Sequence, residues 1–254
     1  MSQSLRAIWY LFYREVLRFT RLRSRWIGSL ATPLLFWFMI GGGVGASFGN
    51  DSGPGAPGYF EFMFPGILVM AVLFTSIFST VSVIEDRHQG FLQGVLVTSV
   101  PRWNFVLAKI LSGAALGLLQ AVLLILVASL TGIQVALSAW AGAVLLLFSM
   151  GLLLTALGFA FAWILDSVQG FHGIMNLILM PMWILSGSLF PVDRGPKLLQ
   201  IIGMLNPLSY AVKPLRELIS TSHTESLGTG LIAMVAAFAL LFFISVSRVE
   251  KPAK

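Results

Sequence analysis

Long runs of uncharged, mainly apolar residues alternate with short charged segments along this chain of 254 residues. Charged side chains are costly inside a lipid bilayer, and a helix needs about 20 apolar residues to cross it. The uncharged runs cover 26–50, 62–84, 110–165, 167–192 and 226–247. The third run has 56 residues and a polar break near Thr131 and Gly132, so it holds two helices. The pattern predicts six membrane-spanning helices, at 26–47, 62–84, 105–131, 138–164, 172–190 and 226–247.

The composition agrees with an all-α integral membrane protein and excludes several other classes. Charged residues make up 10% of the chain, hydrophobic residues make up 57%, and the mean hydropathy is +0.90. Soluble domains carry about 25% charged residues, so a soluble enzyme, a disordered chain and a nucleic-acid binder are excluded. The net charge of +6 indicates basic loops facing anionic lipid, so we expect membrane lipid as a partner and no nucleic acid. The absence of cysteine excludes disulfides, thiolate metal sites and cysteine nucleophiles.

Lysine and arginine are distributed unequally between the two sides of the predicted bundle. Six spans place both termini on one side, which carries twelve basic residues: Arg6, Arg14, Arg18, Arg21, Arg23, Arg25, Arg87, Arg102, Lys109, Arg248, Lys251 and Lys254. The other side carries four, Arg194, Lys197, Lys213 and Arg216. Because cytoplasmic loops are enriched in Lys and Arg, both termini are expected in the cytoplasm.

Residues 1–25 are expected to form an N-terminal amphipathic helix in the membrane interface. Its apolar face carries, at helical spacing, Leu5, Ile8, Trp9, Phe12, Val16 and Phe19. The opposite face carries four residues that can reach lipid phosphates, Arg14, Arg18, Arg21 and Arg25. A basic anchor without a fixed helix is the alternative. A cleavable signal peptide is not expected, because the apolar run that follows is a full-length span.

The chain lacks the residues that bind ATP or a metal ion in known motifs. A phosphate-binding loop needs Gly-Lys followed by Ser or Thr, and none of the five lysines has that context. His88, His172 and His223 have no metal-ligand spacing. We therefore expect no catalytic, cofactor or metal site in this chain, which is not an enzyme by itself. The central part of each span lacks charge, which disfavours an ion-driven transporter or a channel, so energy for transport would come from another polypeptide.

The connection between the second and third spans, 85–103, is the most informative segment. Glu85, Asp86 and Arg87 follow the span directly, and an acidic start favours a helix N-terminus. The apolar face of a short helix then follows, at Phe91, Leu92, Val95 and Leu96. Such a helix fits contact with lipid and docking to a soluble partner equally well.

The segment 191–216, before the last span, is the second irregular region. Residues 198–212 form an uncharged run of 15 residues, too short to span and interrupted by Asn206-Pro207. We expect short re-entrant or interfacial helices on the outer side. An ordinary outer loop with an apolar patch is the alternative.

Several residues within the spans have expected packing roles. Pro181 should kink the fifth span, because it removes a backbone donor. Small residues that allow close helix packing are Gly113, Gly117, Gly151 and Gly158. The aromatic residues Phe36, Trp37, Phe38, Phe74 and Phe78 fit either a lateral pathway for a lipid-like substrate or simple contact with lipid.

Several short sequences in this order resemble the ABC-2 family of membrane subunits, the permeases of ATP-binding-cassette exporters. They are the basic N-terminal helix, Phe64-Pro65-Gly66-Ile67, Glu85-Asp86-Arg87 with Gly90, Val97-Thr98 and Pro101, Leu185-Ser186-Gly187-Ser188-Leu189-Phe190-Pro191 with Val192-Asp193, and Asn206-Pro207 with Tyr210 and Arg216. Each is weak alone, but together on six spans they cover nearly the whole chain. The chain is similar to permeases that export drugs, antibiotics, lipids or lipo-oligosaccharides.

The resemblance implies a homodimer, or a heterodimer with a related permease, bound to two separate ATPase subunits that hold ATP and Mg²⁺. It implies that 85–103 contains a coupling helix seated in a groove of the ATPase. It divides the chain into the helix 1–25, a six-span ABC-2 domain 26–250 and a cytoplasmic tail 251–254, in the cytoplasmic (inner) membrane of a prokaryote. Two features depart from the family pattern: Gln93 replaces a common glutamate, and Thr98-Ser99 is not followed directly by proline.

The predicted function is that of an exporter permease whose substrate path lies between two copies. The alternative is a membrane scaffold or assembly subunit that transmits ATPase motion without moving a substrate. The predicted ATPase-coupling residues are Glu85, Asp86, Arg87, Gly90, Gln93, Gly94 and Arg102. The charged triplet would fix the end of the second span, the glycines would allow close packing, and Arg102 would anchor at the headgroups. Asp166 offers a further ATPase contact or lies in a solvated turn, and the substrate-binding residues are not predicted.

Overall fold

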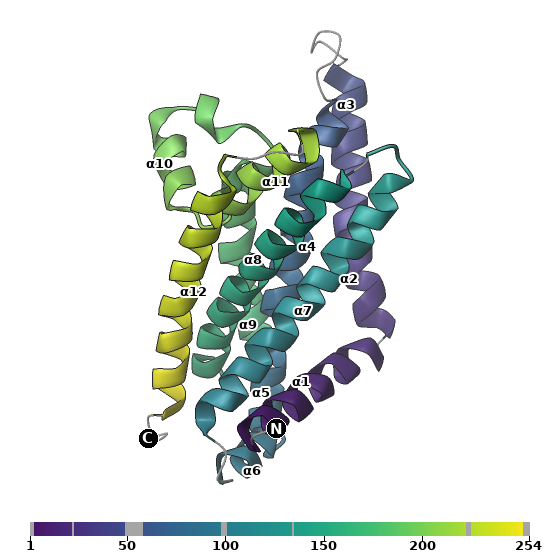
Figure 1. Cartoon of the computed structure of the whole chain (residues 1–254). Helices are drawn as coiled ribbons and strands as arrows, with labels where there is room; N and C mark the ends of the chain where they lie inside the picture. Colours follow the sequence, from purple (N-terminus) through teal and green to yellow (C-terminus); the bar gives the residue numbers. More distant parts are fainter. Residues whose placement is uncertain are drawn as a thin grey trace.

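The computed structural model describes residues 3–21, 23–48, 58–97, 101–133, 135–221 and 225–250, and these fold into helices without any strand (Figure 1). The first part contains α1 (Gln3–Arg21), α2 (Arg23–Phe36), a π-helical turn (Trp37–Gly42) and α3 (Gly43–Phe48). The central part contains α4 (Tyr59–Ser79), α5 (Val81–His88), α6 (Phe91–Val97), α7 (Arg102–Ser129) and α8 (Leu137–Ile164). The last part contains α9 (Val168–Trp183), a π-helical turn (Ile184–Ser188), a 3₁₀ turn (Val192–Arg194), α10 (Lys197–Leu205), α11 (Ser209–Thr221) and α12 (Leu227–Glu250).

Six of these helical segments are long and apolar enough to cross a membrane, which confirms the predicted number of spans. They are Trp26–Gly45, Tyr59–His88, Arg102–Ser129, Leu137–Ile164, Val168–Ser188 and Leu227–Val249. The second span is longer than predicted because α5 continues α4 after a single turn residue, Thr80. The chain is thus an all-α integral membrane protein.

Helix α4 forms the centre of the bundle. It packs against α2, α7, α8, α9 and α11, and its side chains from Met63 to Leu73 are buried. Burying large side chains such as Phe64 and Ile67 stabilises the fold by roughly 1.5–3 kcal/mol each in soluble proteins; within a bilayer the gain comes mainly from close packing. Helix α12, by contrast, lies at the edge of the bundle with its apolar side chains largely exposed, as expected for a helix that contacts lipid.

The four glycines predicted to allow close packing do so. A Cβ atom on Gly113 of α7 would lie 2.5 Å from Cγ2 of Thr155 on α8, and one on Gly158 of α8 would lie 2.8 Å from Oγ1 of Thr80. Gly117 and Gly151 are similarly close to neighbouring helices. Any larger residue at these positions would push α4, α7 and α8 apart.

The fifth span bends, but not at Pro181 as predicted, because the helix runs through Pro181 and the backbone leaves helical geometry only at Gly187. Helix α9 ends two residues after Pro181, and the chain continues as the π-helical turn Ile184–Ser188, in which Gly187 has a φ of +87°. The ring nitrogen Nε1 of Trp183 donates to the carbonyl of Gly66 at 2.8 Å and ties this bend to α4. A positive φ favours glycine, so the turn depends on Gly187.

The segment after the fifth span contains two short helices, α10 and α11, as predicted. Asn206 separates them: its Nδ2 donates to the carbonyl of Met182 at 2.6 Å, and its Oδ1 accepts from the backbone nitrogen of Leu208 at 3.0 Å. Both helices lie at the end of the bundle opposite α6 (Figure 1). Their depth in a bilayer remains a prediction. The start of α1 and the end of α12 lie at the same end of the bundle as α6 (Figure 1).

Candidate functional site

The predicted coupling segment lies at one end of the bundle, between α5 and α7 (Figure 1). After α5 ends at His88, Gly90 turns the chain with a φ of +74°, and α6 begins at Phe91. Leu92 is buried, whereas Gln93 and Gly94 are exposed and Val97 is 88% exposed. Helix α6 therefore rests on the bundle by one face and presents the other outward. Thr98-Ser99 lies outside the described residues.

The prediction that Glu85, Asp86 and Arg87 open a helix was wrong. They form the C-terminal part of α5, which continues the second span, and Gly90 separates them from α6. The interaction of a carboxylate with a helix terminus is worth only about 0.3–1 kcal/mol. Leaving a buried carboxylate without a cationic partner costs about 3–5 kcal/mol, so the position of these acidic residues follows their ion pairs rather than the helix dipole.

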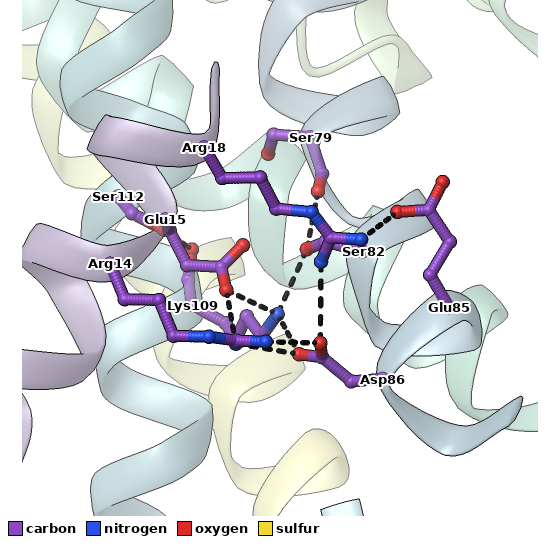
Figure 2. Close-up of polar contacts among 9 residues, drawn as sticks. All are labelled: Arg14, Glu15, Arg18, Ser79, Ser82, Glu85, Asp86, Lys109 and Ser112. Carbon is purple, nitrogen blue, oxygen red and sulfur yellow. Dashed lines mark hydrogen bonds and ion pairs between the residues drawn. The ribbon is translucent and has the colours of Figure 1, made fainter. Parts of the chain in front are cut away.

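Asp86 is the centre of these ion pairs and is fully buried. Its Oδ1 accepts from Nη2 of Arg14 at 2.9 Å and from Nη1 of Arg18 at 3.2 Å (Figure 2). Its Oδ2 accepts from Nζ of Lys109 at 2.5 Å and from Nη1 of Arg14 at 3.3 Å. Three cations from α1 and α7 therefore hold one carboxylate of α5.

Two further acidic residues complete this group. Glu15 Oε1 lies 2.9 Å from Nζ of Lys109 and 2.9 Å from Nη1 of Arg14, and Glu85 Oε2 lies 2.6 Å from Nη2 of Arg18. We call Arg14, Glu15, Arg18, Glu85, Asp86 and Lys109 the ion cluster. Its three positive and three negative charges balance, and it joins α1, α5 and α7 (Figure 2).

The N-terminal helix is confirmed as a helix, but the predicted role of two of its arginines was wrong. Arg14 and Arg18 were expected to reach lipid phosphates, and they instead turn inward to the carboxylates of α5. The reason is that the carboxylate of Asp86 is fully buried and needs counter-charges. Burial disfavours the charge of Arg14, yet the hydrogen bond and proximity to Asp86 leave its pKa raised above the ordinary value. The apolar residues Leu5 and Trp9 remain more than half exposed.

The ion cluster also contacts the coupling segment itself. The guanidinium carbon of Arg14 lies 3.7 Å from the ring centroid of Phe91, the first residue of α6. A cation over an aromatic face is an attractive contact of roughly 0.5–2 kcal/mol. Phe91 thus connects α6 to α1, and through Arg14 to Asp86 and Lys109.

The two remaining basic residues of the predicted site tie this end of the bundle together. Arg87 lies 2.6 Å from Oδ1 of Asp166 and donates to the last carbonyls of α8, at Ala162 (3.2 Å) and Trp163 (2.6 Å). Arg102 Nη1 donates to the carbonyl of Val249 in α12 at 3.0 Å. Both arginines therefore satisfy helix C-terminal carbonyls.

Sequence reasoning missed Glu15 and Lys109 as members of this site. Lys109 is 4% exposed although it lies within an apolar helix, and Glu15 is 7% exposed on a helix that is otherwise basic at this point. A single lysine just inside a predicted span and a single acid on an amphipathic helix are the sequence signals, because each needs a buried partner.

The histidines do not form a metal site in the described part of the chain. No group of three or more His, Asp or Glu side chains there is close enough to hold a metal ion. His88 is exposed, and the ring of His172 lies 4.6 Å from that of Phe78. His223 lies outside the described residues.

The five aromatic residues considered for a lateral pathway lie in different surroundings: the ring of Phe36 packs edge-on against Trp183, and Phe38 is 47% exposed. Phe74 and Phe78 line a mainly apolar cavity of about 450 Å³ between α2, α4 and α9. Trp37 is fully buried, and its Nε1 donates to the carbonyl of Phe60 at 3.0 Å. Trp37 therefore has a packing role in this structure.

Comparison with known proteins agrees with this architecture. The family model described as "ABC-2 type transporter" matches residues 6–219. The chain belongs to the ABC-2 type transporter family. As a member of the ABC-2 family, it is a transmembrane transporter subunit of the permease type, which works with ABC ATPase subunits and is not itself catalytic.

Several relatives of this ABC-2 protein are similar along most of their length. Nodulation protein J of Neorhizobium galegae is 25% identical over 239 residues, which cover 89% of this chain and 85% of the relative. Nodulation protein J of Sinorhizobium fredii is 28% identical over 238 residues, with the same coverage. The "Putative transport permease ycf38" of Cyanophora paradoxa is 30% identical over 168 residues, which cover 65% of this chain and 57% of the relative.

Proposed function

We propose that this chain is the permease subunit of an ABC exporter, working as a dimer in the cytoplasmic membrane of a prokaryote with both termini in the cytoplasm. Separate ATPase subunits, which bind ATP and Mg²⁺, would dock on the segment 85–103. The substrate would move along a path at the interface of the two permease copies. Export and dimer formation come from the family resemblance.

The observation that carries the proposal is the placement of α6. Gln93 and Gly94 on its outer face are exposed, and no other part of the described chain covers them. Leu92 on the opposite face is buried against the bundle. A short helix that is anchored by one face and exposed by the other suits docking into a groove of a partner. Gly90, Gln93 and Gly94 would belong to the docking surface.

The ion cluster supports a way for this docking to act on the spans. Movement of α6 would displace Phe91, which contacts Arg14 at 3.7 Å, and Arg14 is bound to Asp86 on the second span. Asp86 is bound in turn to Lys109 on the third span. Because removing one partner of a buried ion pair costs about 3–5 kcal/mol, these contacts favour movement as one unit. Glu85, Asp86, Arg87 and Arg102 would therefore be positioning residues rather than direct ATPase contacts.

The test compares two glycine-to-tryptophan variants of the tagged chain, purified from its native membrane in mild detergent. A Cβ atom on Gly94 of α6 or on Gly228 of α12 would meet no atom within 4 Å, so both variants should fold. We expect an ATPase subunit and ATP hydrolysis to copurify with the unaltered chain and with Gly228→Trp, and to be lost with Gly94→Trp. An ATPase that copurifies equally with all three chains would rule out docking on α6.

A second measurement separates transport from the scaffold alternative. The purified assembly would be placed in liposomes, and its ATP hydrolysis would be measured with and without lipid and amphiphile extracts of the source cells. A transporter should hydrolyse ATP faster when its substrate is present. A scaffold that only transmits ATPase motion should not respond.

A further inference from the structure

A cavity of about 330 Å³ lies at the end of the bundle opposite α6, between the turn that follows α9, the helices α10 and α11, and the start of α12. It is lined by more polar groups than the apolar cavity beside Phe74, including Ser209, Lys213 and Arg216 of α11. Asp193 also lines it, so the charged lining residues sum to one net positive charge. The proposed docking of an ATPase makes no use of this region.

The guanidinium group of Arg216 is held in place by two contacts, and neither of them neutralises its positive charge. Its Nη2 donates to the carbonyl of Gly187 at 2.8 Å, and its guanidinium carbon lies 4.0 Å from the ring centroid of Phe62. Its Nε is buried and has no hydrogen-bond partner. A carbonyl and an aromatic face orient a guanidinium but carry no full negative charge, so the cation remains uncompensated.

The electrostatics of Arg216 agree with this description. Burial lowers its pKa to about 10, and the nearby charge of Asp193 only partly opposes that shift. Arg216 keeps its charge at neutral pH, yet it forms no ion pair with Asp193 in the described part of the chain. Glu217, the next residue, is bound through its Oε2 to the hydroxyl of Ser226 at 2.6 Å.

Ser209 provides an independent observation on the same cavity wall. Its hydroxyl is buried and has no hydrogen-bond partner. Buried polar groups without partners are rare in folded proteins, and each needs an explanation. The hydroxyl of Ser209 and the Nε of Arg216 both lack an acceptor, and Lys213 adds an exposed cation on the same helix. All three groups can donate hydrogen bonds.

We propose that this cavity binds an oxyanion of the phosphate class, either as a lipid headgroup or as a free ion. The planar guanidinium of Arg216 matches a phosphate group, Lys213 adds a point charge, and Ser209 adds a hydroxyl donor. The cavity has a volume of about 330 Å³, many times the roughly 30 Å³ that one water molecule occupies in the liquid, so it has room for a group larger than water.

The helix beside the cavity suits the lipid form of the ligand. Four side chains of α10 are more than half exposed, Leu198, Ile201, Met204 and Leu205. Met204 also lines the cavity. An apolar helix face that rests on acyl chains would bring the cavity to the level of the headgroups. This anion site does not depend on ATPase docking. Evidence against the site would therefore leave the proposed function untouched, and evidence against ATPase docking would leave the site untouched.

The test measures thermal unfolding of the full chain, in the assembly in which it is purified, by tryptophan fluorescence. One arm adds sodium phosphate against sodium chloride at equal ionic strength, and the other adds dioctanoyl phosphatidylglycerol against dioctanoylglycerol. We expect a saturable rise of the unfolding midpoint with the phospholipid. A rise with inorganic phosphate as well would show that the free ion suffices.

The variants locate the site. Arg216→Gln should raise the half-saturating concentration at least about tenfold, as expected when a charge-assisted hydrogen bond is lost. Arg216→Lys should give an intermediate value. Lys197→Gln, which removes a charge on α10 outside the cavity, should leave it unchanged. The absence of saturable stabilisation by both probes, or the same half-saturation for Arg216→Gln and the unaltered chain, would overturn the proposal.

A second pair of changes keeps the test decisive if Arg216→Gln does not fold. Ser209→Ala combined with Lys213→Gln removes a hydroxyl and an exposed charge from the same wall, without touching the contacts of Arg216 with Gly187 and Phe62. This double variant should bind at least about threefold more weakly. Unchanged half-saturation in this variant would also overturn the proposal.

Discussion

The two ends of this molecule differ in the groups that contact their buried cations. In the ion cluster, three cations face three carboxylates, and each carboxylate lies within 3 Å of at least one cation. In the cavity at the opposite end, Arg216 faces a carbonyl and an aromatic ring instead of a carboxylate. The charges of the ion cluster are neutralised within the subunit, which suits a mechanical role. The charge of Arg216 would be neutralised only by a bound anion.

The largest effect is expected from Asp86→Ala in the ion cluster. The change leaves Arg14 and Lys109 without their shared carboxylate in a buried place, which should destabilise the protein by about 3–5 kcal/mol. The measurement is the unfolding midpoint by fluorescence-detected size exclusion. Asp166→Ala is the control, because that carboxylate is 83% exposed and its pair with Arg87 should contribute less than about 1 kcal/mol. Equal midpoints for the two variants would contradict the view that the cluster is essential to the fold.

A double-mutant cycle tests whether the charges act as one unit. Lys109→Met and Asp86→Asn, introduced singly and together, should show a coupling energy of about 0.5–3 kcal/mol, because each change alone leaves a partner uncompensated. The same unfolding assay serves here. Strictly additive effects would mean that the contact between Lys109 and Asp86 is of no energetic consequence.

Removing the unbalanced cation should cost less than breaking the cluster. In the absence of added anion, Arg216→Gln loses one hydrogen bond and one cation–π contact but relieves an uncompensated buried charge, so we expect a change of about 1 kcal/mol or less. The comparison is with Lys109→Met under identical conditions. A larger loss for Arg216→Gln would indicate that Arg216 is a structural residue already satisfied within the subunit.

The smallest effect is expected at the partly exposed edge of the ion cluster. Glu85 and Arg18 are each 25% exposed, and water screens their attraction. Glu85→Gln should therefore change the unfolding free energy by less than about 1 kcal/mol. A loss of unfolding free energy as large as that of Asp86→Ala would show that the buried and the partly exposed ion pairs of the cluster contribute equally.

The sequence was sufficient to predict the helical architecture, but it was not sufficient to predict the ion pairs inside the candidate site. The six spans followed from charge spacing, since the cost of a charge in hydrocarbon acts on every residue of a span. The break at Asn206-Pro207 was enough to predict α10 and α11. These features depend on local chemistry, which a single sequence displays directly.

The same pattern could not tell where the charged side chains of the site point. Arg14 and Arg18 have the spacing of a face that contacts lipid phosphates, and they bind Glu85 and Asp86 instead. Their partners lie 67–72 positions away in the chain. Helical periodicity gives the direction of a side chain around its own helix, but it does not say which other helix occupies that direction.

The sequence by itself therefore determined the class of protein and the number of spans, because hydropathy and charge act locally. Only the tertiary structure decided that Asp86 is buried among three cations and that Arg216 has no carboxylate partner. The physical reason is that the energy of a charge depends on all neighbours within a few ångströms, and those neighbours come from helices that are distant in sequence.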